Sequence, residues 1–440
     1  ALRVVRAQSG VTNAMSGGSG LLIKSDTHYQ DNFSAGEASS GEWGARTAGT
    51  HGNSLGVSMC TSPEAFEETL TAAGEVAGTP AVGATTVNVS AGGGSVGAGG
   101  AKYNVGDIVF FQEADGQQYE VTAINNDALT IRQLDNPNGG GLKSALADGT
   151  DVRRRWAFYD LFDSAPGTST YATSKNVSDD EMHIVVYDKT GDISGFRKDT
   201  AGERTNAVLE TYAFLSQHPN AKTPQGGTNY YPDVIFKQSS FVYWLDHPSV
   251  LSNAGTARTS GQAYAHGDGT TGQIEFALSG GTDDYVVTVG ELDTAYNEFA
   301  DAETVDVNLI MGGTSPAGAD GTQHATNLID IAEKRKDVVV FISPRRADVV
   351  NIANSTTQAS NVKTFFDGLA SSSYAVFDSG YKYMFDKFND VFRFVPLNGD
   401  VAGLCANTDQ VADPFFSPGG FNRGQIRGAV KLAFNPNKAQ

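Results

Sequence analysis

Apolar runs alternate with helical patterns in the C-terminal part of the chain. The runs are VDVNLIMGG (305–313), DVVVFISP (337–344) and YAVFDSG (374–380). Helical patterns are centred on Leu292, Ala295, Tyr296 and Phe299, on His324–Lys334 and on Val362–Leu369. Apolar strands separated by helices are typical of parallel sheets that are covered on both faces. The pattern therefore predicts an α/β domain with right-handed crossovers.

The stretch Tyr381–Phe434 combines closely spaced aromatic residues with a strand-like FRFVP and three turn clusters, and it predicts densely packed core. Its last part, Asn422–Phe434, is predicted as an amphipathic helix, since Ile426, Ala429, Val430, Ala433 and Phe434 recur at helical spacing. The opposite face carries Arg423, Arg427 and Lys431. These cations form either a solvated surface or a contact face for an acidic partner.

Residues 63–156 show the alternating pattern of a small antiparallel β domain, of barrel or sandwich type. The expected strands are TTVNV (85–89), DIVFFQ (107–112), QYEVTAI (118–124) and ALTIRQL (128–134). The glycine-rich run Ala91–Ala101 is predicted to be a flexible loop, because it lacks the Lys-Ser/Thr that a phosphate-binding loop requires.

The flanking segments predict an α+β domain. Strands are expected at Ser54–Cys60 and His183–Asp188, a helix near Ala207–Gln217, and a polar loop or hairpin over Asp26–Gly41. The first apolar segment, Leu2–Ala7, has no β partner nearby and is predicted to pair with the C-terminal sheet.

The predicted fold class is thus α/β plus β, with several domains. A discontinuous α/β core domain comprises residues 1–11 and 282–440. An inserted α+β domain comprises 12–62 and 157–281, and a second inserted β domain comprises 63–156. The chain begins within a strand pattern and stops soon after a helical one, which favours a fragment of a longer polypeptide.

Charge argues against nucleic acid as a direct partner, since 31 basic and 50 acidic residues leave a net charge of −19 that repels phosphate. The triplet Arg153–Arg155 is predicted to be a solvated strand edge, and Lys334–Lys336 to lie at the end of a helix, where the helix dipole favours cations. No signal peptide and no apolar run near 18 residues is present, so neither secretion nor membrane insertion is expected.

Candidate chemistry is sparse. His51 in GTHGNS and Ser315 in GGTSPAG loosely resemble the motifs of subtilisin-like hydrolases, but Asp26, the available third group, lies in a polar loop. Seven scattered His residues and the acidic clusters at Asp179–Glu181 and Asp283–Asp284 lack metal-site spacing, and these clusters are expected to be solvated turns. Cys60 and Cys405 are predicted to be buried or half-buried thiols in a reducing compartment. No catalytic, metal or cofactor site is expected.

Residues 381–434 resemble the tail sheath proteins of contractile-tailed, T-even-like bacteriophages. The resemblance rests on YKYMFDKFND, VPL, AGLCANTD and SPGGFNRGQI in this order, with Gly419 at a position that is usually Ala and Phe416 at another altered position. LRVVRA at the start and FADAETVDVNLIMGG (299–313) also look like the sheath pattern, whereas residues 12–275 resemble it only generically.

This resemblance implies a structural subunit, not an enzyme. Sheath proteins polymerise in stacked six-fold rings around a tail tube and contract from a metastable extended state, so the implied partners are further copies of the chain, the tube protein, and baseplate and tail terminator proteins. The implied location is the virion tail, assembled in the host cytoplasm. Sheath proteins extend beyond both ends of this chain. A secreted or surface β-rich binding module is the main alternative.

Overall fold

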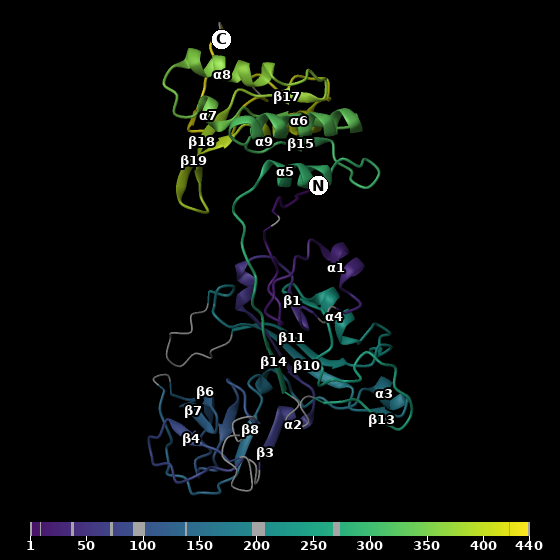
Figure 1. Cartoon of the computed structure of the whole chain (residues 1–440), viewed down its shortest axis with the longest axis vertical. Helices are drawn as coiled ribbons and strands as arrows, with labels where there is room; N and C mark the ends of the chain where they lie inside the picture. Colours follow the sequence, from purple (N-terminus) through teal and green to yellow (C-terminus); the bar gives the residue numbers. More distant parts are fainter. Residues whose placement is uncertain are drawn as a thin grey trace. The chain divides into compact units, whose positions relative to one another are not determined.

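The computed structural model describes residues 2–8, 10–36, 39–70, 74–90, 102–136, 139–195, 207–266, 273–421 and 423–438. The described chain mixes helices with several sheets and divides into two compact units (Figure 1). The first unit joins Ala1–Ser9 to Asp284–Gln440, and the second comprises Gly10–Asp283. The predicted mixed, multidomain class is confirmed at this level, while the finer three-domain division stays a prediction.

A three-stranded parallel sheet lies at the centre of the first unit, as predicted. Its strands are β15 (Leu309–Met311), β16 (Val339–Ile342) and β17 (Ala375–Phe377). The helices of this unit are α5 (Val289–Asn297), α6 (Gly318–Arg335), α7 (Arg346–Val349), α8 (Ser355–Asp367) and α9 (Asn398–Val411). The first strand is shorter than the apolar run 305–313 predicts, and α9 was not predicted.

Helices cover both faces of this sheet. Ile310 and Val340 point to α6, where they share a buried cluster with Leu328. Side chains alternate along a strand, so Met311 points to the opposite face. There α9 contacts β15 and β16, and Gly399 at its start lies beside the Met311 sulfur. The burial predicted from the continuous apolar runs is therefore present in β16, whereas Met311 of β15 and Phe377 of β17 are 40% and 38% exposed.

An antiparallel sheet of order β19–β18–β20 completes the first unit. Its strands are β18 (Tyr381–Asp386), β19 (Val391–Pro396) and β20 (Lys431–Leu432). The first two form a hairpin in which Tyr383 faces Phe394 and Phe385 faces Phe392. The strand expected at FRFVP is confirmed.

The second unit contains a four-stranded sheet of order β11–β10–β2–β14. These strands are β2 (Leu55–Cys60), β10 (Glu181–Asp188), β11 (Ala207–Ser216) and β14 (Gln273–Ala277). Two-stranded pairs join β1 (Trp43–Ala45) to β12 (Val242–Trp244) and β9 (Val177–Ser178) to β13 (Gln262–Ala263). The helical segments are α1 (Asp26–Asn32), η1 (Thr50–Ser54), α2 (Pro63–Phe66), η3 (Tyr159–Leu161), α3 (Thr170–Ser174) and α4 (Tyr231–Gln238).

A six-stranded antiparallel sheet also belongs to the second unit. Its strands, in spatial order, are β3 (Glu67–Leu70), β8 (Val152–Arg155), β5 (Ile108–Phe110), β6 (Tyr119–Asn125), β7 (Ala128–Gln133) and β4 (Thr86–Asn88). The strands predicted in 63–156 are thus confirmed. The expected barrel is not confirmed. In the described residues the sheet is open, with β3 and β4 as its two edge strands. The glycine-rich run Ala91–Ala101 lies outside the described residues.

Two local predictions in the second unit are wrong. Residues Ala207–Ser216 form strand β11 instead of a helix, since their β-branched and aromatic side chains pair with β10. The polar segment after Ser25 begins with helix α1, because the Ser25 side chain accepts a hydrogen bond from His28 N and caps it. Short-range capping therefore outweighs the low apolar content of this segment.

The N-terminal segment also differs from its prediction. Residues 2–8 lie in the first unit but form no strand, so Leu2–Ala7 does not pair with the C-terminal sheet as expected. Leu2 and Val4 are 74% and 81% exposed. A segment that buries neither of these side chains has no apolar face to fix a strand register.

Two charged groups predicted to be solvated are buried. Strand β8 lies between β3 and β5, so the triplet Arg153–Arg155 is not at an edge, and Arg154 is fully buried. Asp180 is also fully buried and accepts hydrogen bonds from Ser169 N and Oγ, both at 2.8 Å. In both cases backbone and side-chain partners within the fold replace water.

Asp188, the last residue of β10, holds the following turn. Its carboxylate accepts hydrogen bonds from Ser54 Oγ, from Gly191 N (2.9 Å) and from Ser194 N (2.7 Å). Burial by itself would raise the pKa of this carboxyl, but the hydrogen bonds from Ser54 and Ser194 outweigh it and lower the pKa to about 2.

We expect Asp188→Asn to lower the free energy of unfolding of the second unit by about 2 kcal/mol at pH 7. The folded pKa lies below the ordinary value of 3.8, so this contribution is present above that value and is lost as the pH falls toward 2. Urea unfolding at several pH values measures the difference in the free energy of unfolding between wild type and variant. This difference should become smaller below pH ~4. Asp192→Asn, on the same turn but exposed, is the control. A pH-independent difference would contradict this account.

Candidate contact surface of the C-terminal segment

The segment predicted as the last helix is extended and irregular in the described residues. Strand β20 (Lys431–Leu432) pairs with Lys382 and Tyr383 of β18. Gly424 and Gly428 lie four residues apart, and Gly428 has φ +71, which a right-handed helix does not accept. Because pairing with an existing strand also satisfies backbone groups, the helical periodicity does not lead to a helix.

Arg423, Arg427 and Lys431 therefore do not share a helix face. The Arg423 guanidinium lies over the Phe416 ring, 5.6 Å from its centroid, and its Nε donates to Ser417 O (3.3 Å). The carbonyl of Arg427 accepts a hydrogen bond from Lys382 Nζ (3.2 Å). The prediction that these cations share one helical face is wrong. Their role in contacts between subunits stays a prediction.

Lys431 lies against a row of aromatic rings on one face of the β18–β19 hairpin. Its Nζ is 5.5 Å from the centroid of Tyr383 and 6.0 Å from that of Phe394. Tyr383 and Phe394 pack at 4.8 Å, and Phe385 and Phe392 at 5.0 Å. A cation over a ring face is attracted by the ring quadrupole. The hairpin thus presents rings together with positive charge.

The tip of the hairpin extends this surface. Phe388 is 87% exposed, and Lys387 Nζ lies 5.0 Å from the centroid of its ring. Phe385 and Phe392 are 43% and 52% exposed. Figure 1 shows the hairpin projecting from the rest of the first unit. We call this surface the hairpin face, and it consists of Tyr383, Phe385, Lys387, Phe388, Phe392, Phe394 and Lys431.

The opposite side of the hairpin is anchored to the body of the unit. Lys382 Nζ pairs with Asp400 of α9 at 2.8 Å, while within the hairpin itself Arg393 pairs with Asp386 at 3.1 Å. Lys382 is buried, whereas Arg393 is half exposed. On the other side, Phe394 packs against the buried cluster of Val349, Val350, Tyr381 and Phe434, whereas Phe385 and Phe392 nearer the tip remain exposed.

Exposed apolar side chains are concentrated in the first unit. Sixteen of the 21 large hydrophobic side chains that are exposed in the described residues belong to it, although it is the smaller unit. Phe415 and Phe421, in the loop after α9, are 82% and 107% exposed. The prediction of a densely packed core for Tyr381–Phe434 is therefore wrong for much of the stretch. Adjacent exposed rings such as Phe415 and Phe416 are typical of interaction surfaces.

The hydrolase candidates are not brought together within either unit. Ser315 is buried and its Oγ donates a hydrogen bond to Ser343 O at 2.6 Å, which joins two loops at the carboxyl ends of β15 and β16. His51 belongs to the second unit and Ser315 to the first. Asp26 pairs with Arg46 at 2.8 Å and accepts from Tyr243 OH at 2.5 Å. Ser315 and Asp26 thus each have a structural hydrogen-bond partner of their own.

The loops at the carboxyl ends of the parallel strands form a buried polar network. Ser343 Oγ donates to Asp378 Oδ2 (2.6 Å) and accepts from Asn398 N (3.1 Å). Asn398 Nδ2 donates to Gly313 O (2.6 Å). Burial raises the pKa of Asp378 to about 6, although the hydrogen bond from Ser343 opposes the shift. These bonds fasten α9 to the sheet, and α9 in turn anchors the hairpin.

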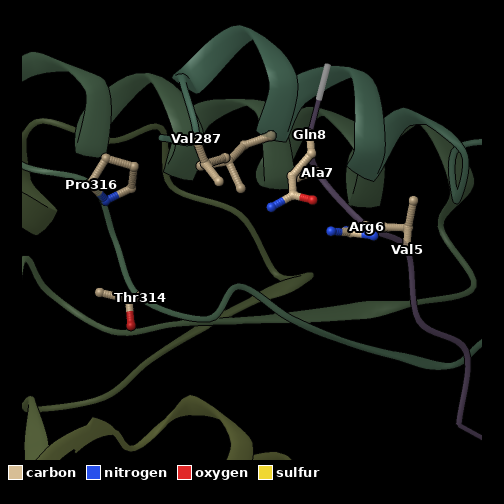
Figure 2. A pocket seen from close by; sticks show the side chains of 8 residues that line it. Val5, Arg6, Ala7, Gln8, Val287, Thr314 and Pro316 are labelled. Carbon is tan, nitrogen blue, oxygen red and sulfur yellow. The ribbon is translucent and has the colours of Figure 1, made fainter. Parts of the chain in front are cut away.

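A shallow depression of about 530 Å³ in the first unit is the other surface feature of note. Figure 2 shows residues 5–8 along one side of it and Val287, Thr314 and Pro316 on the other. Arg6 is the one charged side chain of its lining, so the depression offers no acid–base pair.

The described part of the chain offers neither a metal site nor a membrane-spanning helix. Within it, no group of three or more His, Cys, Asp or Glu side chains could hold a metal ion. No helix there is both long enough and apolar enough to span a membrane. Cys60 is buried and Cys405 half-buried, both as free thiols, as predicted.

The resemblance to tail sheath proteins is confirmed by comparison with curated proteins. The chain is similar to the tail sheath protein of Enterobacteria phage T4 (41% identity, 37% of this chain and 26% of the relative). It is also similar to those of Vibrio phage KVP40 (33%, covering 54% and 34%) and Salmonella phage ViI (27%, covering 63% and 40%). The matched region thus spans less than half the length of each relative. No protein-family model matches the chain.

Proposed function

Because the chain is homologous to the tail sheath proteins of three myoviruses, we propose that it is a structural subunit of a contractile phage tail sheath. In this role it polymerises with further copies in stacked six-fold rings around the tail tube and joins baseplate and tail terminator proteins. It is then a virion component without enzymatic activity or cofactor, assembled in the host cytoplasm. The homology carries this proposal.

The structure supports an assembling role in physical terms. A sheath subunit needs a rigid body and surfaces that bind its neighbours. The parallel sheet with helices on both faces supplies the rigid body, and the hairpin face supplies a surface for binding neighbours. Contraction is then a change between two packings of rigid subunits that differ in free energy and are separated by a barrier. No nucleotide is required, because the energy is stored in the extended packing and drives the tube through the host envelope for DNA delivery.

Negative-stain microscopy of the purified chain at increasing concentration tests this proposal. We expect tubes or stacked rings with six-fold symmetry. In Phe388→Ser we expect these assemblies to require about tenfold more protein, because an exposed aromatic anchor is lost. Val82→Ser removes an apolar side chain that is 64% exposed in the second unit and should leave assembly unchanged. Discrete particles alone at every wild-type concentration would overturn the proposed function.

A further inference from the structure

The first unit carries an acidic segment that the homology leaves unassigned. Residues 284–306, which comprise α5 and the loop after it, contain seven acidic side chains and no basic one. Glu298, Asp301, Glu303 and Asp306 are exposed. We call residues 284–306 the acidic segment.

Arg335 holds the backbone of this loop. The Arg335 side chain is 1% exposed, and its guanidinium donates to Phe299 O (2.6 Å) and Val305 O (3.0 Å). It also pairs with Asp337 at 2.8 Å. Arg335 therefore fixes the shape of the loop from inside, while the carboxylates of Glu298 and Glu303 face solvent.

The hairpin face has the opposite charge. The seven residues that define it include two cations and no acidic side chain. Lys387 and Lys431, the cations of the hairpin face, each lie over an aromatic ring. An acidic partner would therefore meet positive charge and rings together.

The acidic segment also offers apolar area. Tyr285 and Val286, at its start, are 85% and 75% exposed. Aromatic rings bury more apolar area than any other side chains and dominate the energetics of many interfaces. The acidic segment thus offers apolar area before α5 and negative charge after it, while the hairpin face offers rings and positive charge.

Resting on the proposed function, we infer that the hairpin face of one copy docks on the acidic segment of a second copy. Both surfaces belong to the first unit, and both are exposed in the same chain, so they do not cover each other within one molecule. A contact between two different surfaces of identical chains is heterologous, and it generates rings or open helical polymers instead of closed dimers. Complementary charge sets the register and speeds encounter.

A charge-swap experiment on the full chain tests this pairing. One variant carries Lys387→Glu and Lys431→Glu, and the other carries Glu298→Lys and Glu303→Lys. Alone, each presents two like-charged surfaces, and we expect self-association about tenfold weaker than wild type, measured by sedimentation velocity at low salt. Mixed in equal amounts, the two variants have complementary surfaces again, and co-assembly should return. The control, Lys24→Glu with Lys237→Glu, reverses two exposed cations of the second unit.

The outcomes separate this inference from the proposed function. Recovery on mixing, with weak association of each variant alone, supports the pairing. If both variants alone polymerise as strongly as wild type, the pairing is overturned and the sheath role stays intact. The same holds if both variants associate weakly alone and mixing them does not restore polymerisation. A wild-type chain that stays monomeric at every concentration would overturn both.

Discussion

Replacing Arg154 with methionine is expected to lower the free energy of unfolding of the second unit by about 3–5 kcal/mol. The guanidinium is fully buried and donates to Ala65 O (3.2 Å) and Glu64 O (2.8 Å). Asp107, also fully buried, has its carboxylate 3.9 Å away. Methionine fills similar volume but leaves a buried carboxylate and two carbonyls without their cationic partner.

The pH dependence distinguishes this mechanism from a packing defect. Burial raises the pKa of Asp107 to about 6, and Arg154 opposes that shift. A carboxyl whose folded pKa exceeds its unfolded one costs stability as the pH rises through the interval between them. Without Arg154 the folded pKa rises further, so the deficit of Arg154→Met should be smaller at pH 5 than at pH 7.

Urea unfolding followed by tryptophan fluorescence measures both effects, since Trp156 follows β8 directly. Arg153→Met is the matched control, because its side chain is 47% exposed and pairs with Glu67 at the surface. It should change the free energy of unfolding by no more than about 1 kcal/mol. The structural role assigned to the buried pair would be refuted if Arg154→Met lowered the free energy of unfolding no more than the control does. A loss of equal size at pH 5 and pH 7 would refute it as well.

Replacing Leu328 with alanine is expected to destabilise the first unit by about 3 kcal/mol. Leu328 lies on α6, is fully buried, and packs with Ile310, Val340 and Phe365 over the parallel sheet. The substitution leaves a cavity between helix and sheet, and the surrounding side chains fill it only in part.

Hydrogen exchange read by mass spectrometry localises this effect. Protection should fall in α6 and β16 and stay unchanged in the four-stranded sheet of the second unit, because the two units have separate cores. Asp330→Ala, on the exposed side of the same helix, should leave protection near that of wild type. Equal loss in both units would show that they unfold as one cooperative body.

Several elements could be predicted because their signal is local. The run VVVFIS has enough consecutive apolar residues to be buried on both faces, and the helical pattern at His324–Lys334 has a continuous apolar stripe. Helix α9 was missed, since glycines at 399 and 403 and polar side chains weaken its periodicity. It forms because Asn398 is fastened to the strand loops by hydrogen bonds that only the fold brings together.

The candidate surface was predicted only in part. Lys431 was identified, but on a helix face that does not form, and the rings beside it were assigned to core. An aromatic residue on a hairpin is buried or exposed according to what packs on its face, and that packing is absent from the local pattern. The row Tyr383, Phe385, Phe392 and Phe394 shows this, because it alternates along both strands as a buried face would.

The sequence by itself determined the alternation of helices and parallel strands in the C-terminal part, the β character of residues 63–156, and the relationship to tail sheath proteins. All three depend on residue types at short spacing. Only the tertiary structure decided that Arg154 is buried, that residues 431–432 form a strand, and that Phe388 is exposed. These outcomes depend on partners that are distant in the sequence: the strands beside β8, the edge of β18 to which β20 pairs, and α9, which covers one side of the hairpin. A local sequence pattern contains no information about these partners.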